Sequence, residues 1–403
     1  MVPVPERDSF LSQRGTSSVT GAYRARFMVI GEHLSSPADF KYDALLVSFH
    51  NLAEFIGLTG FKRRSLNAAW TWVRPAVLGA TLGDCAVQTS YSMRSSGSAF
   101  SGDRQMAERA WLELKGATRL SVEEAYAGPI TSLRYLAQLS VGHQLPIISL
   151  CGEKGLRGRG RRASVHHSSI FFEEKRSLPL PEQAPPVRLL FTLQELGTNL
   201  AQYLASWHEG FTLFRDALDY YFSLDPRADR SVAIEHHFTT IINALEIYHR
   251  RKGVTRYELD PAKHEERVER IVSAASAEDQ SWLRGKLQFS NEVNLRTRVR
   301  ELFNQAPDPL RKACGEGKRF INSVVTTRNY LIHHDDKNKS RQLSGVSLWA
   351  ATENLRMLLA CAFCRQLGFP DDKIAAAFRR SPNFFWLLHR TETSGAVSPE
   401  AKS

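Results

Sequence analysis

The hydrophobic periodicity of this chain changes near residue 210, and this change limits the possible folds more than any other feature. Before it, short alternating runs at 26–30, 109–114 and 187–191 are typical of half-buried strands. After it, apolar residues recur at the helical period, as in Phe238, Ile241, Ile242, Leu245 and Tyr248. We therefore predict an α+β fold, with an N-terminal mixed, sheet-containing domain over residues 1–208, an all-α helical bundle over 209–390 and a disordered tail over 391–403.

The composition excludes several classes of protein. Hydrophobic residues make up 42% of the 403 positions and charged residues 24%, which is typical of globular rather than disordered or fibrous proteins. No apolar run approaches the roughly 18 to 20 residues that a bilayer span needs, and the first six residues lack a signal-peptide core. We therefore expect a cytoplasmic protein with no membrane partner. The five cysteines do not suit a secreted disulfide framework, so we expect them to be reduced.

Local patterns place several further elements. Ser121–Glu124 is a capping-box pattern followed by apolar residues at helical spacing, which predicts a helix over 122–140. A strand is predicted at 145–150. In the C-terminal half, the patterns predict helices over 261–276, 292–303 and 308–333, and a buried stripe formed by Leu355, Leu358, Leu359, Ala362 and Phe363.

A basic, glycine-rich segment lies at residues 151–162. It carries five basic residues against Glu153, and its glycines predict a loop without regular structure. The glycines match neither a P-loop nor a dinucleotide-binding fingerprint. The whole chain has 53 Lys and Arg against 42 Asp and Glu, a net charge of +11 that favours polyanionic partners. The segment is therefore either a solvated loop or a contact for RNA or DNA, and the sequence leaves both open.

One arginine falls on the apolar stripe of the helix that ends near residue 333. The stripe contains Ile321, Val324, Val325 and Ile332, and Arg328 is its next member. Burying an uncompensated guanidinium costs several kcal/mol. Arg328 must therefore be paired, lie at an interface, or face a site built for anions.

His333 follows Arg328 by five residues, close to the expected end of the same helix. At 100° per residue, side chains five apart diverge by about 140° on an ideal helix. One chain alone therefore does not bring the two side chains together on a regular helix. They can meet if the helix end relaxes, or if two copies face each other across a two-fold axis.

These residues resemble a known signature. The segment 328–333 is similar to the RxxxxH motif of HEPN-domain ribonucleases, including the polar Asn329 directly after the arginine. The predicted helix over 238–249, with its Ala-Leu-Glu sequence at 244–246, resembles the first HEPN helix of the ApeA-like anti-phage group. The upstream half resembles the N-terminal domain of that group in two segments, 27–33 and 40–49.

The resemblance implies RNA cleavage without a metal or cofactor, in which the 2′-OH attacks the adjacent phosphate and leaves a 2′,3′-cyclic phosphate. Histidine has a reference pKa near 6.5, so His333 suits the role of acid or base. Arg328 can hold phosphate oxygens and stabilise the charge of the transition state. Asn329 can orient the backbone or the phosphate. The implied partners are RNA, with tRNA as one candidate, a second copy bound through the HEPN domain, and a phage-derived trigger of abortive infection.

Three alternatives accompany this interpretation. Arg328 can be a structural residue paired with Glu246, with His333 interacting favourably with the helix dipole. His334 can take the active role instead of His333, although the motif spacing favours His333. The domain as a whole can be a non-catalytic HEPN module that binds nucleic acid or a partner protein.

Other candidate sites give weaker signals. Cys361 and Cys364 have a metal-like spacing but lie on an apolar helical stripe, which predicts buried thiols. The pairs 166–167 and 236–237 are histidines that we expect to be exposed or at helix caps. The tryptophans of the first half are predicted to be core aromatics, although such rings can also stack on bases. These tryptophans are Trp70, Trp72 and Trp111.

Overall fold

The computed structural model describes residues 26–63, 65, 70–97, 105–156, 164–173, 183–224, 232–253, 255–257, 260–334 and 336–394. Among these residues the chain divides into two compact units. The first extends to Pro186 and includes Phe191–Ala205, and the second comprises Val187–Leu190 and the residues from Ser206 onward. The later boundary falls within a helix, α5 (Leu200–Ser223), and not in an irregular linker.

The first unit is built on an antiparallel sheet. Seven strands of the described residues pair in the order β1-β11-β10-β3-β8-β7-β6. The strands are β1 (Phe27–Ile30), β3 (Ala44–Phe49), β6 (Gly79–Leu82), β7 (Cys85–Ser96), β8 (Gln105–Gly116), β10 (Ile147–Leu156) and β11 (Ser164–Phe172). Two short pairs lie outside this sheet: β2 (Lys41–Tyr42) with β9 (Leu120–Ser121), and β4 (Phe61–Lys62) with β5 (Thr71–Trp72).

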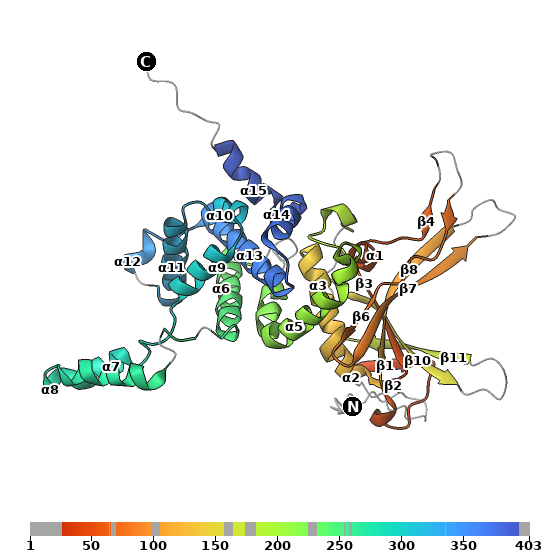
Figure 1. Ribbon diagram of the computed structural model, residues 1–403, viewed down its shortest axis with the longest axis horizontal. Helices are drawn as coiled ribbons and strands as arrows, with labels where there is room; N and C mark the ends of the chain where they lie inside the picture. The colour runs from red at the N-terminus through yellow and green to blue at the C-terminus, as the bar shows by residue number, and fades with distance from the viewer. Residues whose placement is uncertain are drawn as a thin grey trace, which may run out of the picture. The chain divides into compact units, whose positions relative to one another are not determined.

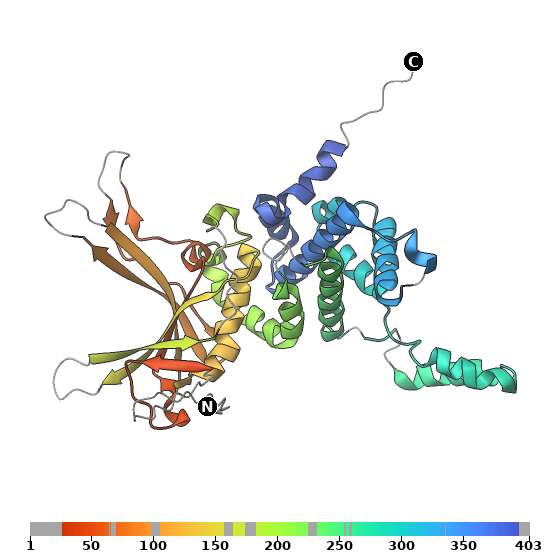
Figure 2. The same cartoon turned by 180° about the vertical axis from the view of Figure 1, so that it is seen from behind.

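Helices cover one face of the sheet. The helices α1 (Leu52–Ile56) and α3 (Thr131–Val141) lie on the same side of it in both views (Figures 1 and 2). In β8, buried Ala110, Leu112 and Leu114 alternate with partly exposed residues on the other face. The strand predicted at 109–114 is confirmed within β8, and the strands predicted at 26–30 and 145–150 are confirmed as β1 and β10.

The helix predicted over 122–140 is also confirmed, with an irregular middle. It consists of α2 (Val122–Ala125), a π-helical turn over Tyr126–Ile130 and α3. The Ser121 hydroxyl accepts a hydrogen bond from the Glu124 backbone N–H at 3.5 Å and caps the N-terminus. Pro129 lies inside the π-helical turn, where it cannot donate a backbone hydrogen bond.

The strand predicted at 187–191 is wrong. Pro186–Arg188 forms a 3-10 helix, and the residues after it pair with no strand of the described chain. Arg380 donates instead to the carbonyl oxygens of Leu189 and Leu190, at 2.9 and 2.7 Å from its Nε and Nη2. This short apolar run is therefore held by packing and by side-chain hydrogen bonds, and not by the backbone pairing with another strand that its pattern predicts.

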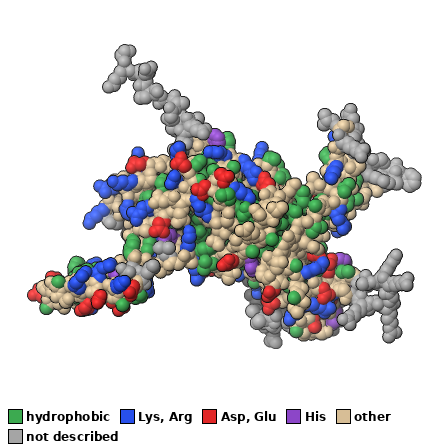
Figure 3. Space-filling view, in the orientation of Figure 1, with side chains coloured by type: hydrophobic (Ala, Val, Ile, Leu, Met, Phe, Trp, Pro, Cys, Tyr) green, Lys and Arg blue, Asp and Glu red, His purple; other side chains and the backbone are tan. Residues whose placement is uncertain are grey.

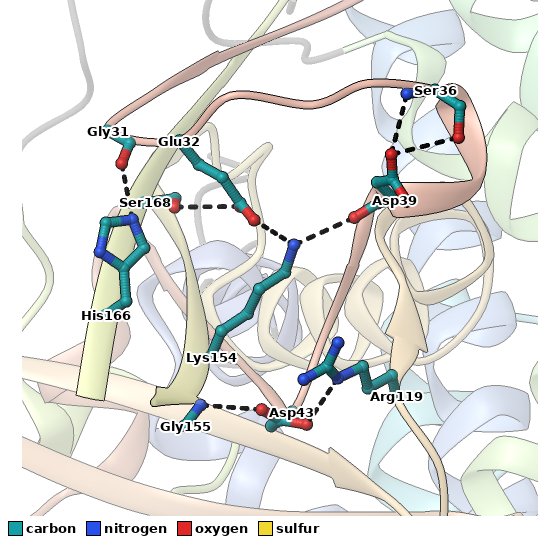
Figure 4. A network of polar contacts seen from close by, with 10 residues as sticks. All are labelled: Gly31, Glu32, Ser36, Asp39, Asp43, Arg119, Lys154, Gly155, His166 and Ser168. Carbon is teal, nitrogen blue, oxygen red and sulfur yellow. Dashed lines mark hydrogen bonds and ion pairs between the residues drawn. The ribbon is translucent and has the colours of Figure 1, made fainter. Parts of the chain in front are cut away.

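A partly buried ion pair fixes the segment between β1 and β2 against β10 (Figure 4). Lys154 Nζ donates to the Glu32 carboxylate and to the Asp39 carbonyl oxygen, the latter at 3.1 Å. The Lys154 and Glu32 side chains are only 14% and 15% exposed. Burial opposes ionisation of Glu32, but hydrogen bonds from Lys154, Tyr42 and Ser168 outweigh it and lower the Glu32 pKa.

This network corrects the prediction of a loop at 151–162. Residues 151–156 continue β10 and pair with β11, because the ladder satisfies their backbone groups. Gly152 is required there, since a Cβ atom would lie 2.3 Å from the Tyr42 ring. The Gly155 N–H donates to Asp43 Oδ2 at 2.8 Å. The remaining residues of the predicted basic loop, from 157 onward, lie outside the described residues.

We expect Glu32→Gln to lower the free energy of unfolding of this unit by about 1–3 kcal/mol, because it leaves the partly buried Lys154 ammonium without its charge partner. Chemical denaturation at neutral pH measures the effect. Exposed Glu123 on α2 supplies the control, and Glu123→Gln should change stability by less than about 1 kcal/mol. Equal losses in the two variants would show that the pair contributes nothing specific.

The second unit is a helical bundle. After α5, its helices are α6 (Ile234–Arg251), α7 (Pro261–Ser273), α8 (Ala277–Leu287), α9 (Leu295–Gln305), α10 (Asp308–Cys314), α11 (Gly317–His333), α12 (Asp336–Lys339), α13 (Gly345–Gln366), α14 (Asp371–Arg380) and α15 (Pro382–Ser394). The predicted helices 261–276 and 292–303 are confirmed as α7 and α9. The predicted stripes on α6 and α13 are buried, and these two helices pack together through rings such as Tyr248 and Phe363, whose centroids are 5.4 Å apart.

Two predicted boundaries in the bundle are wrong. The single helix expected over 308–333 is two helices, because Gly315 adopts a left-handed φ of 79° and ends α10. The tail expected to be disordered from residue 391 continues as helix α15 to Ser394. The rest of that tail, 395–403, lies outside the described residues.

The predictions for cysteine and histidine pairs have mixed outcomes. Cys361 and Cys364 are buried thiols in α13, as expected, and burial raises the pKa of Cys361 to about 12. His167 is exposed, and its Nδ1 lies 3.2 Å from Glu153 Oε1 across β10 and β11. His237 is buried within α6, so the expectation of an exposed or capping residue is wrong there.

The tryptophans are not buried core residues as predicted. Trp70 is 59% exposed, and the other two are partly exposed. Trp111 alternates with Ala110 and Leu112, so the β8 pleat turns its ring onto the less covered face. Its Nε1 donates to Ser92 Oγ at 3.1 Å on the neighbouring strand. The sequence alone does not indicate which face of a strand the helices cover.

Candidate active site

The arginine of the motif lies on α11 and points toward α6. Arg328 Nη2 lies 3.9 Å from Glu246 Oε2, and the two side chains are 30% and 20% exposed. Arg328 Nη1 donates to Asn329 Oδ1 at 3.4 Å. The pairing with Glu246 that the sequence suggested is therefore present, but at the long end of the range for an ion pair. A long, partly exposed pair contributes little to stability, about 0.2–1 kcal/mol.

Arg328 and Asn329 line one pocket. Its volume is about 460 Å³, and α6, α9 and α11 contribute to its walls. The lining residues include the carboxylates Glu246 and Glu292, and the cations Arg250 and Arg296. Phe289, 64% exposed, also lines it. The guanidinium therefore faces an open cavity, which is the geometry of a group that can meet an anion.

The structure does not bring His333 to this pocket within one chain. His333 is the last residue of α11 and is exposed, and the described residues that line the pocket do not include it. His334 caps the helix in a left-handed conformation with φ 49°, and its N–H donates to the Tyr330 carbonyl oxygen at 2.7 Å. The separation of Arg328 and His333 by five residues on a regular helix accounts for this divergence.

The predicted stripe on α11 is partly wrong. Ile321 and Val324 are buried, but Ile332 is 52% exposed. Thr327 is buried in its place, and its Oγ1 accepts a hydrogen bond from the Leu343 N–H at 2.9 Å. The buried side of α11 therefore continues from Val324 to Thr327, and the last turn, with Ile332, faces solvent.

The surface around α11 is basic. No Asp or Glu occurs among the residues of α11, which include Lys318, Arg319 and Arg328. Lys337 and Lys339 follow on α12, where Asp336 is the one acidic residue. Figure 3 shows Lys and Arg side chains gathered over the end of the bundle where α11 and α12 lie. A positive surface beside the pocket favours a polyanionic ligand.

A buried polar cluster behind the pocket was missed from the sequence. Arg298 on α9 is 1% exposed; its Nε donates to the Val293 carbonyl oxygen at 3.0 Å, and its Nη1 lies 3.2 Å from His249 Nδ1. His249 Nε2 lies 2.7 Å from Glu301 Oε2. Arg298 lies on the same helical stripe as the apolar residues Val299 and Leu302. An arginine on an apolar stripe, the pattern that Arg328 also shows, is therefore the sequence signal for Arg298.

This cluster predicts a pH dependence of stability. Burial lowers the pKa of His249 from its usual 6.5, although the Glu301 carboxylate opposes the shift. Because the folded-state pKa is lowered, the stabilising contribution is full above about pH 6.5 and is lost as the pH falls through the lowered value. Arg298 and Lys252 also oppose protonation of the ring.

We expect the stability of the bundle to fall as the pH decreases below about 6.5, by up to about 1.4 kcal/mol per pH unit, until the pH passes the lowered pKa of His249. His249→Gln should flatten this dependence, whereas His236→Gln, at an exposed position of the same helix, should preserve it. Denaturation at a series of pH values measures both variants. If His249→Gln left the slope of stability against pH unchanged, His249 would not be the group responsible. Some slope should remain in this variant, because burial also lowers the pKa of His208.

Two further properties of the described residues concern ligands and membranes. They contain no group of three or more His, Cys, Asp or Glu side chains arranged to hold a metal ion. Among them, no helix has the length and apolar character needed to cross a bilayer.

Comparison with known families identifies both halves of the chain. Residues 7–207 match the ApeA N-terminal domain 1, and residues 239–373 match the Apea-like HEPN domain. No curated protein and no solved structure is significantly similar to the chain. The second match contains Arg328, Asn329, His333 and Glu246, and together the two matches comprise most of the sequence. The chain therefore belongs to the ApeA-like HEPN proteins.

Proposed function

We propose that this protein is a metal-independent HEPN endoribonuclease that acts in anti-phage defence. The observation that carries the proposal is an open pocket lined by Arg328 and Asn329. Both residues lie on α11, a helix without acidic residues. Family membership supports the defence role. We also propose that the sheet-containing segment 1–208 senses or binds a trigger and that 209–390 forms the ribonuclease domain.

The residues support a defined division of roles. The 2′-OH of the RNA transfers its proton to His333 as its oxygen bonds to phosphorus, and the bond to the 5′-oxygen breaks as that oxygen takes up a proton. The products are a 2′,3′-cyclic phosphate and a 5′-OH. Arg328 stabilises the charge that grows on the phosphate oxygens, and Asn329 orients the Arg328 guanidinium through the 3.4 Å contact. The required 2′-OH excludes DNA as a substrate.

The active site in this proposal belongs to a homodimer. His333 is exposed at the end of α11 and lies apart from the pocket of its own chain. A two-fold axis near the ends of two α11 helices places the His333 of each chain beside the Arg328 of the other. The exposed ring of Phe289 at the pocket suits stacking on an RNA base.

The second candidate is a non-catalytic HEPN module, which the separation of Arg328 and His333 within one chain favours.

Cells that express the wild type or Arg328→Gln can be challenged with a panel of phages, with plating efficiency and total RNA integrity followed over time. The ribonuclease proposal predicts protection and fragmented RNA in the wild type and neither in Arg328→Gln. Arg270→Gln, at an exposed position of α7 outside both α11 and the pocket, should behave as wild type. Protection with intact RNA would favour the binding module.

A further inference from the structure

The groove between α9 and α11 contains a second pocket beside the one that Arg328 lines. Its volume is about 240 Å³. Three cations, two amide side chains and two apolar side chains contribute to its walls, and none of the described residues that line it is acidic. The side chains are Arg296, Arg300, Lys318, Asn304, Asn322, Phe303 and Ile321.

Among the described residues, the two arginines of this pocket contact only neutral partners. Arg296 Nη1 donates to Asn322 Oδ1, and Arg300 Nη2 donates to Thr297 Oγ1 at 3.1 Å. All three cationic side chains are exposed, and no carboxylate of the described chain lies within ion-pair distance of them. Like charges around one cavity repel one another, and an anion in the cavity relieves that repulsion.

The two pockets are adjacent and share one lining residue. Arg296 lines both. On α11, Lys318 and Asn322 line the second pocket and Val325 and Asn329 line the first, at spacings of i, i+4, i+7 and i+11 that place them on one face of the helix. At 1.5 Å per residue, Lys318 and Arg328 are separated by roughly 15 Å along the axis. A strand can therefore span both pockets only if it is several nucleotides long.

We propose that the second pocket binds a backbone phosphate of the RNA strand, a few nucleotides from the phosphate that meets Arg328. The identity of this ligand rests on the proposed function, whereas the anion-binding character of the pocket rests on its own cations. The groove then selects for strand length, since a short oligonucleotide reaches one pocket and a longer strand reaches both. Phosphate contacts of this kind position a strand without reading its sequence.

The test is RNA binding by full-length protein that carries His333→Ala, so that the RNA stays uncut. Fluorescence anisotropy compares a labelled single-stranded dodecamer with a trinucleotide over a range of salt concentrations. The variant is Arg300→Gln with Lys318→Gln. The matched control removes the same charge from exposed positions of α7, Lys263→Gln with Arg270→Gln. Thermal denaturation verifies that both variants are folded.

We expect the Arg300 and Lys318 substitutions to weaken dodecamer binding about tenfold and to reduce the slope of log affinity against log salt by about 0.7, since the pocket holds one phosphate and each single-strand phosphate contact contributes about 0.7. The trinucleotide and the control variant should change less than about twofold. Equal effects of the variant and the control on dodecamer binding would show that the second pocket does not bind an RNA phosphate. That result would not bear on the proposed ribonuclease function. Dodecamer binding by wild-type protein that cleaves no RNA, either alone or with extract from phage-infected cells, would reject the proposed function and retain the phosphate-binding role of the second pocket.

Discussion

His333→Ala should abolish RNA cleavage and cellular toxicity while leaving the protein folded. Loss of an acid or base group costs about 10²- to 10⁴-fold in rate. His333 is exposed at the end of α11, so its truncation should change the free energy of unfolding by less than about 0.5 kcal/mol. Cleavage rates on total RNA and thermal denaturation of the same preparation measure the two effects separately.

The control for this prediction is the neighbouring histidine. His334 adopts the left-handed conformation that ends the helix, so His334→Asn keeps a residue that tolerates it. If the motif spacing is correct, this variant retains activity. Loss of activity in His334→Asn and retention in His333→Ala would transfer the catalytic role to His334. A folded His333→Ala protein that still cleaves RNA would remove histidine from the mechanism.

Mixing two inactive chains should restore activity if the site is shared between protomers. Arg328→Ala and His333→Ala each disable both sites of a homodimer, but a mixed dimer contains one site with an intact Arg328 from one chain and an intact His333 from the other. Random mixing of equal amounts should therefore recover about a quarter of the wild-type rate. Co-refolded or co-expressed chains with distinct tags allow the mixed species to be isolated.

A site contained within one chain gives the opposite result. Every mixed dimer then lacks one catalytic residue in each site, and the rate stays at the level of the separate variants. A matched mixture of Arg328→Ala chains carrying both tags provides the baseline. The experiment thus distinguishes a shared site from relaxation of the helix end, the two routes by which these side chains can meet.

The sequence predicts the fold class well because periodicity reports burial. The alternation in β8 and the stripe on α6 correspond to real buried faces. The prediction fails where other interactions satisfy the backbone. Residues 187–191 look like a strand, but Arg380 donates to the carbonyl oxygens of Leu189 and Leu190 in place of a neighbouring strand. Residues 151–156 look like a loop, but they pair with β11.

The site is predicted only in part. The spacing of Arg328 and His333 indicates that they diverge on a regular helix, and the pairing of Arg328 with Glu246 is one of the alternatives that the sequence leaves open. The buried contact of Arg298 with His249 joins residues 49 positions apart, so it depends on packing that one sequence does not reveal. The second pocket also depends on packing that the sequence does not reveal, since residues of α9 and α11 line it together.

The most direct measurement incubates the purified protein with total tRNA and mRNA in EDTA and identifies the ends of any products. The account predicts cleavage that persists in EDTA and leaves 2′,3′-cyclic phosphate and 5′-OH ends. If the isolated protein is silent, extract from phage-infected cells supplies the trigger. Cleavage that EDTA abolishes, products with 5′-phosphate ends, or intact RNA in both conditions would contradict the account.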